Sequence, residues 1–65
     1  MLLPQKIWLL MWKVSVSMSE SLDRHRFFTQ EQFARETFAN YLNNHGFTSV
    51  RMLWVDVNGR WTEVD

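Results

Sequence analysis

The clearest periodic pattern in the chain lies between Thr29 and Gly46, where apolar residues recur every three or four positions. This spacing predicts an amphipathic helix over residues 29–46. Thr29 and Gln32 have the spacing of a capping box, and Gly46 followed by Phe47 has the form of a Schellman stop. We therefore expect a helix that packs one broad apolar face on a sheet. That face comprises Phe33, Ala34, Thr37, Phe38, Tyr41 and Leu42.

Residues 50–64 predict a β-hairpin after the helix, because Asn58-Gly59 is a typical tight-turn dipeptide between two apolar-rich runs. Two registers are open, and a one-residue slip exchanges the faces. A two-residue turn pairs Val57 with Arg60, whereas a turn with a glycine bulge pairs Asp56 with Arg60. We favour the two-residue turn. It places Met52, Trp54 and Trp61 together on the face away from Leu53 and Val55.

The N-terminal third predicts one further strand. Residues 7–12 are uninterruptedly apolar, and apolar and polar positions then alternate as far as Met18. Residues 1–10 form a possible appendage, since Met11 is an alternative start. Residues 19–28 are mostly polar or charged, and we expect them to form an exposed connection.

Together these elements predict one α+β domain over residues 1–65, of β-α-β-β order. We expect a three-stranded, mostly antiparallel sheet with one helix packed on one face. A helical crossover makes adjacent strands parallel, so an all-antiparallel sheet places the first strand beside the third. Both hairpin faces carry large apolar groups and one helix covers only one of them. The uncovered face is therefore the candidate interaction surface.

Composition narrows the partners. Seven basic and seven acidic side chains cancel, which argues against duplex nucleic acid, whose binding depends on many phosphate contacts. The absence of cysteine fits a reducing compartment, and we expect a cytoplasmic protein. The apolar run is too short for a membrane span, so we expect no membrane partner. A lone core of this size supplies roughly 3–5 kcal/mol, so some of the ten aromatic rings are expected to meet another molecule.

The leading candidate site is an aromatic patch that binds a protein partner. Trp, Met and Arg are enriched at the centres of protein interfaces. Arg51 and Arg60 would lie at the rim of the patch. Its apolar members would be Met52, Trp54, Trp61 and Trp12, with Trp8 as an alternative to Trp12.

Two other site types use overlapping residues. Single-stranded nucleic acid could stack on the same tryptophans with Arg51, Arg60 and Lys13 on phosphates, although nearby acidic residues oppose this. His25 lies between two arginines, but no second base stands at a defined spacing, so we expect no catalytic residue there. Two histidines without cysteine do not predict a metal site, and no motif predicts a cofactor.

These observations favour a small non-enzymatic protein-binding module, a stoichiometric inhibitor or modulator of a bacterial protein. In size and in its lack of catalytic motifs the chain resembles the small inhibitors that bacteriophages and mobile elements encode, including anti-CRISPR proteins. That resemblance is one of type and transfers no residues. The alternatives are a single-stranded RNA or DNA-binding module and a structural homodimer that pairs through the first strand.

Overall fold

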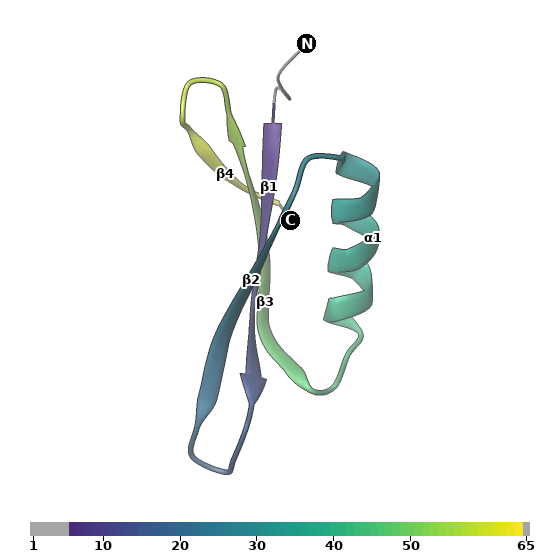
Figure 1. Ribbon diagram of the computed structural model, residues 1–65. Helices are drawn as coiled ribbons and strands as arrows, with labels where there is room; N and C mark the ends of the chain where they lie inside the picture. The colour runs from purple at the N-terminus through teal and green to yellow at the C-terminus, as the bar shows by residue number, and fades with distance from the viewer. Residues whose placement is uncertain (1–5, 65) are drawn as a thin grey trace.

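The computed structural model describes residues 6–64 as a four-stranded antiparallel sheet with one helix on one of its faces (Figure 1). The sheet has the strand order β2-β1-β3-β4. This confirms the predicted α+β class and the helix packed on one face, but the sheet has four strands and not three. The elements are β1 (Lys6–Ser15), β2 (Ser21–Phe28), α1 (Glu31–Leu42), β3 (Phe47–Asp56) and β4 (Trp61–Val64).

The expected connection over residues 19–28 is wrong, because most of it is the edge strand β2. It pairs with β1 along its whole length, from Trp8 opposite Phe28 to Ser15 opposite Ser21. The turn between the strands is short, and the backbone N–H groups of two turn residues donate to the carbonyl of Glu20. An edge strand exposes its polar side chains to water, so β2 tolerates its many charged residues.

The strand order also differs from the expectation. The prediction placed the first strand beside the last strand of the hairpin, which is β4 in the structure. Instead, β1 lies beside β3. Because β2 reverses the chain before α1, β1 and β3 run antiparallel even though a helix lies between them in sequence. Along its described length β1 is flanked by β2 and β3 and has no free edge. The predicted homodimer, in which two copies pair through the first strand, is therefore wrong.

The helix is shorter than predicted at both ends. Its N-cap is Gln30, and within the described chain this cap forms no side-chain hydrogen bond, so the predicted capping box is wrong. The helix ends at Leu42, and Asn43 Nδ2 donates to the carbonyl of Ala39 at 3.1 Å. Gly46 does not have a positive φ, so the Schellman stop is wrong too.

The hairpin adopts the glycine-bulge register, which corrects our preference for the two-residue turn. Val55 pairs with Trp61, and Asp56 N donates to the carbonyl of Arg60 at 3.2 Å. The carboxylate of Asp56 decides the geometry, because its Oδ1 accepts from the backbone N–H groups of Asn58 at 2.8 Å and Arg60 at 3.1 Å. An Asp side chain that binds its own turn in this way favours a longer turn.

The core lies between α1 and the sheet. The buried side chains among residues 6–64 are Trp8, Leu10, Phe28, Ala34 and Met52. Half-buried groups extend this layer, and among them the ring of Trp12 meets Tyr41 edge to face at a centroid distance of 4.7 Å. Large rings therefore supply much of the apolar area that a chain this short can bury.

A substitution at Gly59 tests the conformation of the turn between β3 and β4. Its φ is 78°, and a Cβ added there would meet nothing within 4 Å. Replacement by valine should therefore lower the free energy of unfolding by about 1–3 kcal/mol through backbone strain alone. Thermal unfolding measures this, with Gly46→Val as the control at a glycine without positive φ. A melting temperature unchanged by Gly59→Val contradicts the turn.

Candidate functional site: the open face of the sheet

The predicted aromatic patch is not one surface. Met52 is fully buried beneath α1, and Trp54 and Trp12 pack against the core on that same side. Trp61 pairs with Val55 and therefore lies on the other face of the sheet. The expectation that Met52, Trp54 and Trp61 share an uncovered face is wrong for two reasons. The helix α1 covers the face that carries Met52 and Trp54, and the turn adopts the register that places Trp61 on the opposite face.

The remaining predicted residues are also separated, and Trp8 is buried in the core. Arg51 lies on the same face as Trp61, and its Nε donates to Glu63 at 2.6 Å. Arg60 lies in the turn before β4, where its backbone N–H binds Asp56. Of the six residues expected to bind a partner, the structure therefore brings Arg51 and Trp61 to the face that the helix leaves open.

The open face is the side of the sheet opposite α1 (Figure 1). The strand register places apolar residues across it from edge to edge. In one row, Leu9 of β1 pairs with Phe27 of β2 and with Leu53 of β3. In the next row, Val55 pairs with Ile7 and Trp61. Met11 continues the β1 side of the surface. The apolar members of the open face are Ile7, Leu9, Met11, Phe27, Leu53, Val55 and Trp61.

The two rings at the edges of the open face are the most exposed of these groups. Phe27 on β2 is 58% exposed and Trp61 on β4 is 51% exposed. Single exposed apolar residues are ordinary on a protein surface, but a contiguous set across four strands is typical of a binding surface.

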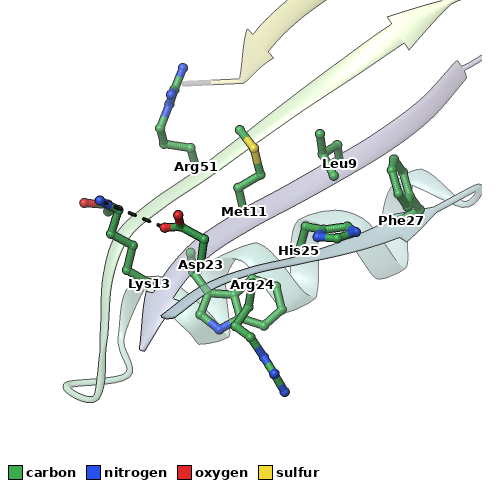
Figure 2. Close-up of a pocket in the computed structure, with 10 residues that line it drawn as sticks. Leu9, Met11, Lys13, Asp23, Arg24, His25, Phe27 and Arg51 are labelled. Carbon is green, nitrogen blue, oxygen red and sulfur yellow. Dashed lines mark ion pairs between the residues drawn. The ribbon is translucent and has the colours of Figure 1, made fainter. Parts of the chain in front are cut away.

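One end of the open face is hollowed. The hollow has a volume of about 400 Å³, and Leu9, Met11 and Arg51 point to the same side of the sheet there, whereas Arg24 points away (Figure 2). The register of β1 and β3 shifts beside this hollow, where Ser49 has a φ of 52°. A β-bulge bends its strand and redirects neighbouring side chains, and bulges often lie next to binding sites. The hollow therefore offers a socket for a protruding apolar group.

The charges on the open face are balanced. Lys13 Nζ lies 4.0 Å from a carboxylate oxygen of Asp23, and Arg51 pairs with Glu63 (Figure 2 shows the first pair). These side chains are about half exposed or more, so each pair adds little to stability. Their effect is on recognition, because neither cation on this face stands without an acid beside it.

His25 lies on this face as well, on β2. Its ring meets Phe27 edge to face with centroids 5.6 Å apart. In the described part of the chain no three His, Cys, Asp or Glu side chains gather where they could hold a metal ion. The geometry at His25 is that of an aromatic contact on the open face.

No family model matches this chain, and no curated protein and no solved structure is similar to it. Within residues 6–64, no helix has the length and apolar character needed to cross a membrane.

Sequence reasoning missed six apolar members of this face, and for three of them a signal was available. Ile7, Leu9 and Met11 stand at alternate positions of the apolar run, so a strand there must place them opposite Trp8 and Leu10. Phe27 has no such local signal, because the residues before it in β2 are mostly polar or charged. The members missed were Ile7, Leu9, Met11, Phe27, Leu53 and Val55.

Proposed function

We propose that the chain is a small non-enzymatic protein-binding module that docks through the open face of its sheet. The observation that carries this proposal is the contiguous apolar surface across all four strands, opposite the face that α1 covers. Large aromatic and aliphatic side chains at the centre of an interface supply most of its binding energy. A surface of this kind gains its affinity by leaving water against another apolar surface.

The balance of charge favours a protein over a nucleic acid. A single-stranded nucleic acid needs free cations for its phosphates beside the rings on which its bases stack. On the open face Lys13 and Arg51 are each paired with a carboxylate. Phosphate would have to displace Asp23 and Glu63, which repel it. The sequence-based alternative of a nucleic-acid module is thus the weaker one.

The form of function that fits such a module is stoichiometric inhibition or modulation of a bacterial protein. A 65-residue chain whose described part holds one helix and four strands has room for one docking surface of ordinary size, about 800 Å². Occupying a functional surface of a target needs no more than that.

Capture from a bacterial lysate tests the proposal. The tagged wild-type chain should retain a protein in a stoichiometric amount after nuclease treatment, whereas Leu53→Asp should lose it because the substitution puts a charge in the middle of the open face. Phe33→Asp is the matched control, since Phe33 is an apolar residue of α1 that is 58% exposed. Capture abolished by nuclease would support the nucleic-acid alternative, and capture unaffected by Leu53→Asp would refute the open face.

A further inference from the structure

We infer that a second copy of this chain covers the open face, so that two sheets pack face to face in a two-fold symmetric dimer. This inference rests on the proposed function, because it names a protein partner for the same surface. Binding of a different protein and formation of the dimer then exclude each other, since both use the apolar residues of the open face.

The exposed area of the chain supports a missing partner of this size. A folded monomer of 7.9 kDa is expected to expose about 4,400 Å² of surface. This chain exposes 5328 Å², an excess on the order of 900 Å² over that expectation. A standard protein interface buries about 800 Å² on each partner, so a dimer through one face would bring the exposed area to the value expected of a folded chain.

The charges of the open face suit a copy of itself. In a two-fold interface the same surface meets itself, so a face with charge of one sign would repel its copy. Here Lys13 and Arg51 are balanced by Asp23 and Glu63. The open face therefore meets an identical face without net repulsion. Lys13 and Asp23 lie beyond the apolar rows, whereas Arg51 lies opposite Met11 and Glu63 lies opposite Leu53.

The placement of the exposed rings also fits a two-fold arrangement. Phe27 lies on β2 and Trp61 on β4, the two opposite edges of the sheet, in adjacent rows along the strands. A two-fold axis along the strands, between β1 and β3, brings β2 of one copy over β4 of the other. Each Phe27 then lies over the edge that carries Trp61. Sheets packed in this way keep their strands roughly aligned.

The edges of the sheet are the less suitable surface for self-association. Along its described length β1 is enclosed, and β4 offers only four residues. The free edge of β2 carries the charged run from Asp23 to Arg26, whose side chains are exposed. Charged side chains on an edge strand hinder pairing with another strand.

Sedimentation velocity at tens of micromolar tests the inference. The wild type should sediment as a dimer, and Leu53→Asp as a folded monomer with the far-UV circular dichroism of the wild type. If Leu53→Asp fails to fold, Trp61→Ser replaces it, because Trp61 is half exposed and its substitution should leave the fold intact. The loss of this ring should raise the Kd of the dimer by about 30-fold, as the loss of a hot-spot ring does. A monomeric wild type, or a Trp61→Ser dimer as tight as the wild type, overturns the inference.

Crosslinking locates the interface, because the natural chain has no cysteine. Leu53→Cys, near the centre of the open face, should give a covalent dimer with a short bismaleimide. Ala39→Cys, an exposed position on α1, should not. A covalent dimer from Ala39→Cys but not from Leu53→Cys contradicts the face-to-face arrangement.

These results separate the inference from the proposed function. If the wild type is a monomer yet captures another protein in a manner that depends on Leu53, the dimer is refuted and the docking function is upheld. If the wild type is a dimer through Leu53 and captures no other protein, the dimer is upheld and inhibition or modulation of a target is refuted.

Discussion

Replacing Met52 with alanine is expected to lower the free energy of unfolding by about 2–5 kcal/mol. Met52 has no exposed surface and lies in β3 between Leu10 of β1 and Val64 of β4. The substitution removes most of a side chain from the centre of the layer beneath α1, where the neighbours on both strands are fixed in the sheet. A core of this size supplies roughly 3–5 kcal/mol in all, so the variant should be largely unfolded at 25 °C.

Leu53→Ala is the matched control for this prediction. Leu53 is the next residue of the same strand, but it lies on the open face and is only half buried. Its truncation should cost about 1 kcal/mol, a typical value for a substitution outside the core. Urea unfolding at low protein concentration compares the two variants without the contribution of association. Equal losses of stability would show that α1 does not cover the Met52 face of the sheet.

The helix and the hairpin could be predicted from the sequence, because each has a local signal. Apolar residues at helical spacing predicted α1, and its centre, from Ala34 to Tyr41, contacts the sheet as expected. The Asn58-Gly59 dipeptide predicted the turn between β3 and β4. The ends of the helix were less predictable, since Thr29 and Gly46 have the right residue types for caps but the chain is held in other conformations there.

β2 was missed because its evidence is not local. Five of its eight residues are polar or charged, and the strand forms because β1 offers it a hydrogen-bonding edge. Long side chains help, as shown by Arg26, whose guanidinium lies 4.9 Å from the ring centroid of Phe28. The missing strand also explains the wrong strand order, because one more reversal of the chain changes the direction in which β3 meets β1.

The candidate surface shows how much depends on one residue of register. Reasoning from sequence predicted that one face of the sheet stays uncovered, and the structure has such a face. The expected members were wrong because the choice of turn sets which of Trp54 and Leu53 lies beside Trp61. Hydrogen bonds that the backbone N–H groups of Asn58 and Arg60 donate to the carboxylate of Asp56 decide between the two turns, and a residue pattern does not contain their geometry.

The two tryptophans of the hairpin are expected to respond to alanine in opposite ways. Trp54 lies on the helix side beside Trp8, and Lys6 Nζ lies 4.1 Å from the centroid of its ring. Trp54→Ala should therefore lower the free energy of unfolding by about 2–4 kcal/mol, somewhat less than for a fully buried ring. Trp61 lies half exposed on the open face, and Trp61→Ala should cost less than about 1 kcal/mol of stability.

Binding should show the reverse order. Trp61→Ala should weaken association through the open face by about 2 kcal/mol or more, as at an interface hot spot. Trp54→Ala, measured where enough of it remains folded, should bind as the wild type does, because its ring lies on the other side of the sheet. Phe38→Ala is the control for a pure loss of core packing, since Phe38 packs against the core from α1.

The decisive measurement pairs thermal unfolding with affinity for each of these three variants. Trp54→Ala and Phe38→Ala should give the same pattern, which is a lowered melting temperature and an unchanged affinity per folded molecule. Trp61→Ala should stand apart, with a nearly unchanged melting temperature and weakened association. If Trp61→Ala unfolds as readily as Phe38→Ala, the ring of Trp61 belongs to the core and is not part of the open face. If it leaves both quantities unchanged, Trp61 does not anchor association, and the face-to-face dimer that places the Phe27 edge over the Trp61 edge is refuted.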